Sequence, residues 1–161
     1  MASLISENLT SAIWEQIAAE KYNANLYLYM AGYLKNLGLD KLGEKFVQQH
    51  EEETGHAKKL FDLLTDLNAP VILQEIPRID MPFGNVIDLA TAYLEREIKT
   101  TTDLNDLKLL SIEENCPVAE ELFREMIRIQ QAEYEEATTF LDQATLTGGD
   151  WKFVLLWDRS L

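Results

Sequence analysis

Acidic side chains and one histidine interrupt two stripes of the sequence that are otherwise apolar, a combination that can bind metal ions. In residues 6–37, one stripe reads Ile13, Ile17, Glu20, Ala24, Tyr27, Ala31, Leu34. In residues 40–67, another reads Leu42, Phe46, Gln49, Glu53, His56, Leu60, Leu63, Leu67. Because alternating steps of three and four residues follow one face of an α-helix, both stripes should face the axis of a helical bundle.

Two later segments repeat this arrangement. Residues 85–114 contain the stripe Val86, Ala90, Tyr93, Glu97, Thr100, Leu104, Leu107. Residues 117–146 contain the stripe Leu122, Met126, Ile129, Glu133, Glu136, Phe140. The glutamates of all four stripes lie roughly 13 to 17 residues into their segments, about 20 to 25 Å from the helix ends at ~1.5 Å per residue. We therefore expect them to share one layer of the bundle.

Five buried carboxylates beside an imidazole would repel one another, and each buried charge alone costs roughly several kcal/mol. Two divalent cations would remove this conflict, because four glutamates neutralise their charge and a fifth accommodates the charge gained on oxidation. Oxygen-rich coordination with one imidazole suits iron or manganese better than copper or structural zinc, although zinc can compete. The pattern thus predicts a site for two metal ions.

The elements that position these residues are four long helices and one short helix. Gly38 ends the 6–37 helix, Asp40 can cap the 40–67 helix, and Pro70 follows its end. The irregular residues 68–84 suit a long crossover between parallel helices, followed by helices over 85–114 and 117–146. A short apolar helix over 150–159 must bury its surface against something. We expect one all-α domain over residues 1–161.

Composition narrows the classes of partner. Twenty-eight acidic and 14 basic residues give a formal charge of −14, which disfavours nucleic acid and anionic lipid as partners and favours cations. The sequence offers no apolar run long enough to cross a membrane and no signal peptide at its start. Its single cysteine, Cys116, cannot form an intramolecular disulfide, so we expect a cytoplasmic protein.

The sequence resembles the ferritin family, whose four-helix bundles carry single glutamates on two helices and glutamate-x-x-histidine motifs on the others. The segment from Glu20 to Tyr27, EKYNANLY, is similar to one family signature, and EEETGHA, which contains Glu53 and His56, is similar to a second. Glu97 occupies the equivalent position in the third long helix. The resemblance covers essentially the whole chain, including the crossover and the short last helix.

This resemblance implies a ferroxidase centre with two iron ions. Glu20 and His56 would bind one iron, Glu53 would bridge, and Glu97 with Glu136 would bind the second. Glu133 would bind the second iron directly or receive a transient ion, and Tyr27 would hydrogen-bond a ligand or supply an electron. Haem is not expected, because Thr54 stands where the haem-binding branch has methionine. Glu52 and Glu135 could form an accessory iron site, although Ala132 fills another of its positions.

The resemblance also implies iron storage. Iron(II) would be oxidised to iron(III) by dioxygen or hydrogen peroxide, and the mineral would collect in a homo-oligomeric shell of twenty-four subunits with the last helix around its fourfold axes. Two other functions stay open. A non-storage di-iron oxidase or peroxidase would share the ligands without the shell, and a metal-free acidic helical interaction module would keep the helices alone.

Overall fold

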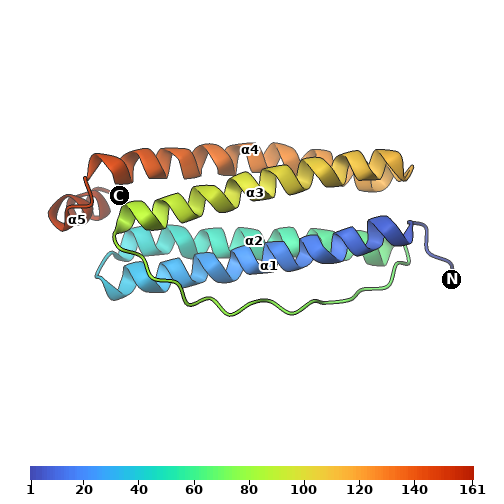
Figure 1. Ribbon diagram of the computed structural model, residues 1–161, viewed down its shortest axis with the longest axis horizontal. Helices are drawn as coiled ribbons and strands as arrows, with labels where there is room; N and C mark the ends of the chain where they lie inside the picture. The colour runs from blue at the N-terminus through green and yellow to red at the C-terminus, as the bar shows by residue number, and fades with distance from the viewer.

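The computed structural model describes residues 1–161. Four long helices and one short helix make up the fold (Figure 1). The helices are α1 (Glu7–Asn36), α2 (Asp40–Asp66), α3 (Val86–Glu113), α4 (Pro117–Leu146) and α5 (Trp151–Ser160), with no strands. Each boundary lies within one residue of the expectation from sequence. The predicted all-α bundle with a long crossover and a short last helix is confirmed.

The turn between α1 and α2 agrees with the sequence prediction at the end of α1 and differs from it at the start of α2. Gly38 has a φ of 79°, a left-handed conformation that suits glycine and ends α1. Asp40 does not cap α2, because the capping position belongs to Leu39, which has no side-chain hydrogen bond to offer. Instead, Asp158 of α5 accepts a hydrogen bond of 2.8 Å from the backbone N–H of Leu42. A residue distant in sequence thus stabilises the start of α2.

The crossover from α2 to α3 runs along the length of the bundle beside α1 (Figure 1). Three side chains of α1 donate hydrogen bonds to its backbone carbonyls. Trp14 bonds to Pro70 at 2.8 Å, Tyr29 to Met81 at 2.6 Å, and Tyr33 to Phe83 at 3.3 Å. Asn85 then caps α3 by accepting from two of its first N–H groups. Because the crossover returns the chain to the other end, α3 runs parallel to α2.

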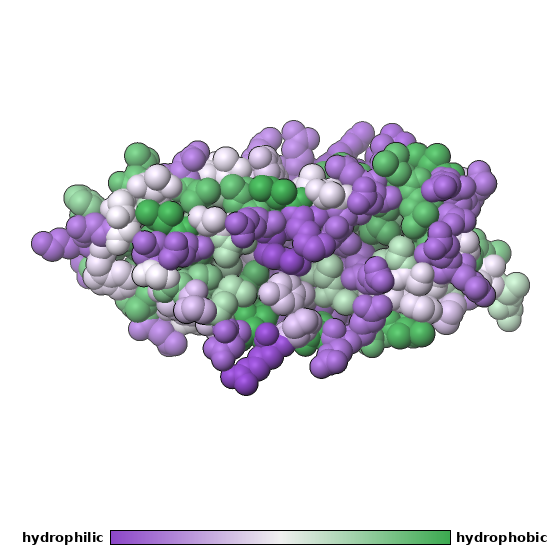
Figure 2. All heavy atoms as spheres, in the orientation of Figure 1, coloured by the Kyte–Doolittle hydropathy of each residue, from purple (hydrophilic) through white to green (hydrophobic).

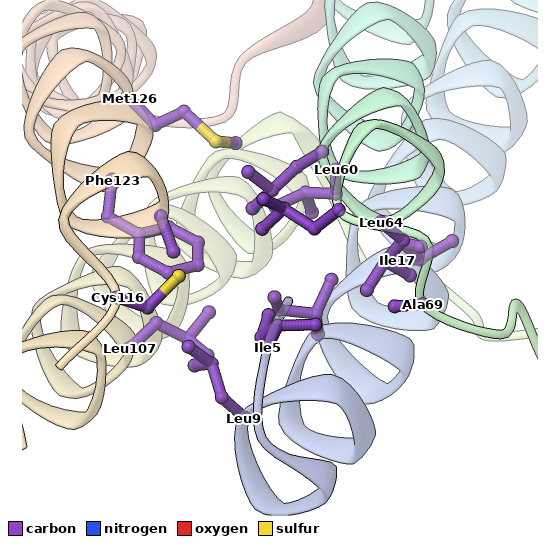
Figure 3. Packing of buried hydrophobic residues seen from close by; sticks show 14 of the residues in the cluster. Ile5, Leu9, Ile17, Leu60, Leu64, Ala69, Leu107, Cys116, Phe123 and Met126 are labelled. Carbon is purple, nitrogen blue, oxygen red and sulfur yellow. The ribbon is translucent and has the colours of Figure 1, made fainter. Parts of the chain in front are cut away.

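The apolar core consists of two separate clusters of 16 buried residues each. The first is mainly aliphatic, with Leu9, Leu60 and Leu64 packed near Phe123 (Figure 3). The second combines aliphatic residues with four aromatic rings, and the rings of Phe46 and Tyr93 meet edge to face at 5.1 Å. Burying each such side chain stabilises the fold by about 1.5–3 kcal/mol. The clusters leave the middle of the bundle to the polar residues described below.

Helix α5 contributes little to this core. It buries only Val154 and Asp158, and it leaves Trp151, Phe153 and Leu156 exposed. Elsewhere the surface is mixed, and Figure 2 shows hydrophilic side chains over much of one face with hydrophobic groups between them. None of the helices combines the length and apolar character needed to span a bilayer.

Candidate metal centre

Five ligand-type side chains converge between the two apolar clusters. Glu20 comes from α1, Glu53 and His56 from α2, Glu97 from α3 and Glu133 from α4, and none is more than 8% exposed. Candidate ligand atoms of Glu20, Glu53 and His56 lie within 4.8 Å of one another, and so do those of Glu53, Glu97 and Glu133. Two groups that share Glu53 are therefore present, each of a size that can surround one cation.

Helix periodicity places these residues inward. Every stripe position predicted for α1, α2 and α3 is buried, apolar and polar members alike. Because residues three and four positions apart share a helix face, the same repeat that buries leucine and phenylalanine also buries the glutamates. The packing of both apolar clusters thus fixes the backbone on either side of the ligands.

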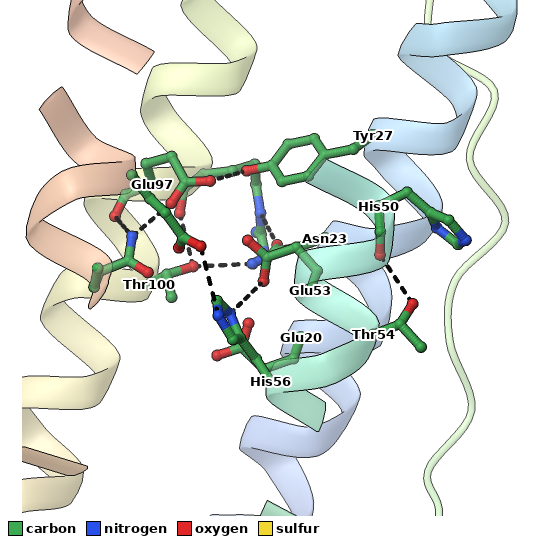
Figure 4. A network of polar contacts seen from close by, with 12 residues as sticks. Glu20, Asn23, Tyr27, His50, Glu53, Thr54, His56, Glu97 and Thr100 are labelled. Atoms are coloured by element: carbon green, nitrogen blue, oxygen red, sulfur yellow. Dashed lines mark hydrogen bonds and ion pairs between the residues drawn. The ribbon is translucent and has the colours of Figure 1, made fainter. Parts of the chain in front are cut away.

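Glu97 is held from two sides (Figure 4). The Tyr27 hydroxyl donates to its Oε1 at 2.5 Å. The Gln130 amide donates to its Oε2 at 2.5 Å and to its backbone carbonyl at 3.2 Å. Charge-assisted hydrogen bonds of this kind stabilise the ionised carboxylate and orient it. Glu97 therefore has a fixed orientation before any ion arrives.

His56 lies between two carboxylates of the cluster. Its Nδ1 is 3.4 Å from Glu53 Oε2, and its Nε2 is 3.5 Å from Glu133 Oε1. One ring nitrogen can bind a cation while the other carries a proton toward a carboxylate, an arrangement that fixes the ring in metal sites. The histidine thus contacts both groups of candidate ligands.

Burial raises the pKa of every glutamate in the layer. Desolvation is the largest cause in each case, and neighbouring carboxylates add to it. The pKa of Glu53 rises to about 8 and that of Glu133 to about 9, while the pKa values of Glu20 and Glu97 also rise. Hydrogen bonds from Tyr27 and Gln130 oppose the rise at Glu97. Proton binding therefore competes with cation binding at these oxygens.

Several carboxylate oxygens in the layer have no hydrogen-bond partner. They are Glu20 Oε2, Glu53 Oε1 and both oxygens of Glu133. Buried polar atoms nearly always have partners, and an unpaired one costs roughly 1–3 kcal/mol. Divalent cations would satisfy these atoms, and the donor set of carboxylates with one imidazole fits iron. The residues present thus suit a pair of metal ions.

Glu136 does not face the bundle axis, and the stripe predicted for residues 117–146 is wrong at this position. Its side chain is 54% exposed and accepts from Lys45 Nζ and Gln49 Nε2, each at 3.3 Å. Ile129 of the predicted stripe is only partly buried. The buried stripe of α4 instead includes Phe123, Met126, Gln130, Glu133, Ala137 and Phe140. Four carboxylates rather than five therefore form the layer.

Gln130 is the polar residue that the sequence prediction missed. It is 1% exposed and lies on the same face of α4 as Met126 and Glu133, at steps of four and three residues. That spacing was the signal available in the sequence. Outside the layer, Glu52 and Glu135 are exposed, although the charge of Glu52 helps to raise the pKa of Glu133.

A second polar group adjoins the layer on the α1–α3 side (Figure 4). Arg96 donates to Asn23 Oδ1 at 2.8 Å, and Asn23 Nδ2 donates to Thr100 Oγ1 at 2.9 Å. Arg96 also stacks over the Tyr22 ring at 4.6 Å from its centroid. These contacts join α1 to α3 one turn from Glu20 and Glu97, which keeps the two helices at a fixed separation there.

Known proteins share both the sequence pattern and the shape of this chain. A sequence profile of the ferritin-like domain matches residues 10–147. A bacterial non-heme ferritin from Campylobacter jejuni is 33% identical over 104 residues, 65% of this chain and 62% of that protein. A probable bacterial non-heme ferritin-like protein from Haemophilus influenzae is 26% identical over 159 residues, 98% and 96% of the two chains. An open-pore ferritin from the archaeon Archaeoglobus fulgidus superposes with a TM-score of 0.93 at 26% identity, covering 99% and 97%.

Proposed function

The chain belongs to the ferritin family, and from this membership we propose that it stores iron by oxidising iron(II) at the buried glutamate layer. One observation carries the proposal. Four carboxylates and one imidazole from four helices meet in a buried layer where oxygens of Glu20, Glu53 and Glu133 have no hydrogen-bond partner in the protein. Iron(II) is the substrate that would supply those partners.

Two neighbouring iron(II) ions would bind in the two ligand groups. Glu20 and His56 would hold the first ion, Glu97 and Glu133 the second, and Glu53 would bridge them. Glu133 takes the role expected of Glu136, because Glu136 lies outside the layer. Four carboxylates balance the charge of two divalent ions. We therefore propose that the layer binds iron(II) more tightly than a trivalent ion.

The protein's own contribution is orientation and charge. Hydrogen bonds from Tyr27 and Gln130 hold Glu97, so little reorganisation accompanies binding. Two iron(II) ions would each give up one electron. With two protons from solvent, the two electrons would reduce one dioxygen to hydrogen peroxide, or one hydrogen peroxide to two waters. The oxidised pair carries two more positive charges than the four carboxylates neutralise, which favours its departure toward a mineral.

Storage requires a homo-oligomeric shell that encloses the mineral, and membership in the ferritin family supports this form. In this chain, the exposed Trp151, Phe153 and Leu156 of α5 supply apolar surface that another subunit would cover. We place twenty-four subunits in the shell, as the family resemblance implies.

Aerobic addition of iron(II) tests the proposal. Wild type should oxidise iron(II) rapidly and elute from a size-exclusion column as a large particle that retains iron. Glu53→Ala removes the bridging ligand and should slow oxidation by on the order of 100-fold, because both ion positions lose a carboxylate. Glu51→Ala, an exposed glutamate on the same helix, is the matched control.

Equal oxidation rates in the wild type and Glu53→Ala would remove the proposed centre. A wild-type monomer or dimer that oxidises iron(II) would instead indicate the non-storage di-iron oxidase. A large particle without oxidation would retain storage and remove the catalytic step.

A further inference from the structure

A groove of about 210 Å³ lies between α1 and α3 beside the glutamate layer. Its lining includes Glu15, Gln16 and Ala19 from α1 and Lys99, Asp103 and Asp106 from α3. Glu15, Lys99 and Asp106 are exposed, so the groove opens to solvent. Neither apolar cluster closes it on the outer side.

Gln16 forms the boundary between this groove and the layer. It lines the groove although its residue is only 4% exposed, and its Nε2 donates to Glu20 Oε1 at 3.1 Å. The other oxygen of Glu20 is buried and has no partner. Gln16 therefore contacts both the groove and Glu20, one of the candidate ligands.

Charge at the mouth of the groove favours cations. Three carboxylates face one lysine, and Lys99 is paired with Asp103 at 2.5 Å. Glu15 and Asp106 form no ion pair. Unpaired carboxylates at the mouth of a narrow groove raise the local concentration of a divalent cation and increase its rate of association.

A second acidic groove, of about 360 Å³ between α2 and α4, lacks this connection. Asp62, Asp66, Glu121 and Glu125 lie at its edges, but its apolar lining consists of Leu63, Val118 and Leu122. It includes none of the five clustered ligands and no residue hydrogen-bonded to them. The two grooves thus have similar charge but different surroundings.

We propose that iron(II) reaches the glutamate layer through the α1–α3 groove and that Gln16 is the gate between them, an inference that rests on the proposed function. The carbonyl oxygen of the Gln16 amide replaces a water of the incoming cation. The Gln16 N–H then releases Glu20, which becomes a ligand. Gln16 acts on access alone and is no ligand of the bound pair.

Cobalt(II) binding to the assembled protein, followed by stopped-flow absorbance, tests the gate without iron oxidation. Gln16→Leu leaves an apolar side chain one atom shorter and removes both the amide oxygen and the N–H. Its association rate should fall by about 10-fold, while the equilibrium affinity stays within about threefold, because a gate changes arrival and departure together. Equal loss of rate and affinity would overturn the gate and make Gln16 a support for Glu20.

Charge variants at the two mouths test the route independently, since all four substituted residues are exposed. Glu15→Gln with Asp106→Asn should slow cobalt(II) association several-fold at low salt and less at high salt. Asp66→Asn with Glu121→Gln removes the same charge from the other groove and should have no effect. Equal effects of the two pairs, or a larger effect of the second pair, would overturn the route.

Failure of this inference is distinct from failure of the proposed function. A wild type that neither binds cobalt(II) nor oxidises iron(II) would refute both. A wild type that does both, with unchanged association rates in Gln16→Leu and in the Glu15 and Asp106 double variant, would refute the groove alone.

Discussion

Two regions of this molecule bury carboxylates. One gives its carboxylate a hydrogen-bond donor, and the other leaves carboxylate oxygens without one. Asp158 of α5 is 5% exposed, and its Oδ1 accepts from the backbone N–H of Leu42 at the start of α2. The partial positive charge of that helix end stabilises it further. Glu133 of α4 is 4% exposed, yet neither of its oxygens has a hydrogen-bond partner.

The difference separates a structural carboxylate from a proposed ligand. Burial alone cannot do so, since both residues are equally inaccessible. What distinguishes Asp158 is that the fold supplies its compensation through a neighbouring helix. The glutamate layer receives hydrogen bonds at Glu97 and in part at Glu20 and Glu53, and neither oxygen of Glu133 has a hydrogen-bond partner. Missing partners, rather than burial, thus distinguish Glu20, Glu53 and Glu133 from Asp158, and we propose that a cation supplies the absent contacts.

The largest expected effect is the loss of iron(II) oxidation when the Glu133 carboxylate is removed. Glu133→Ala should lower the rate of iron(II) oxidation by on the order of 100-fold, because the proposed second ion position loses one of its three carboxylates. Glu136→Ala, three residues along α4, is the matched control and should stay within about twofold. Initial rates of iron(III) absorbance measure both variants. A large loss of oxidation rate in Glu136→Ala alone would show that α4 turns Glu136, and not Glu133, toward the bundle axis.

Most of the fold and three of the four stripes were predictable from the sequence. Glycine, proline and asparagine mark the helix ends, and periodicity fixes the inward faces of α1, α2 and α3. Helix α4 was ambiguous, because two stripes share Met126, Glu133 and Phe140. Steps of three then four residues from Met126 pass through Ile129 and Glu136, whereas steps of four then three pass through Gln130 and Ala137. Packing selects the second stripe, which buries Ala137 fully.

Long-range partners could not be predicted in the same way. The cap of α2 was assigned to Asp40, since capping residues usually adjoin the helix they cap. The actual partner, Asp158, lies 116 residues from Leu42 and meets it only after α5 has folded back. Sequence periodicity reports which face of a helix is inward, but it does not report which helix supplies the neighbour.

An intermediate effect is expected in the pH dependence of the free energy of unfolding. Without metal, Glu53 and Glu133 keep their protons in the folded state to about pH 8 and 9, whereas they lose them near pH 4.5 when unfolded. The free energy of unfolding should therefore be highest below about pH 5 and fall as the pH rises toward 8 or 9. The limiting slope is about 1.4 kcal/mol per pH unit for each group.

Urea unfolding of chelator-treated protein at pH 6 and pH 8, at one protein concentration, measures this slope. Glu133→Gln should flatten it and raise the stability at pH 8, since a glutamine is neutral in both states and need not take up a proton on folding, as Glu133 must at that pH. Glu136→Gln is the matched control and should leave the slope unchanged. A slope that is identical in the wild type and Glu133→Gln would mean that Glu133 carries no desolvation cost.

The smallest expected effect concerns Asp158, where loss of the carboxylate should act on stability and spare the metal centre. Asp158→Ala removes the cap of α2 and should lower the free energy of unfolding by about 1 kcal/mol, the usual contribution of a helix cap. Asp142→Ala, an exposed residue of α4, controls for loss of surface charge. Both variants should bind cobalt(II) with wild-type affinity.

Because Asp158 is already compensated, added metal should stabilise Asp158→Ala as much as wild type, whereas it should stabilise Glu133→Ala less. If metal binding weakened in Asp158→Ala, the two buried carboxylate regions would be coupled through α2, and compensation by the fold would no longer separate them.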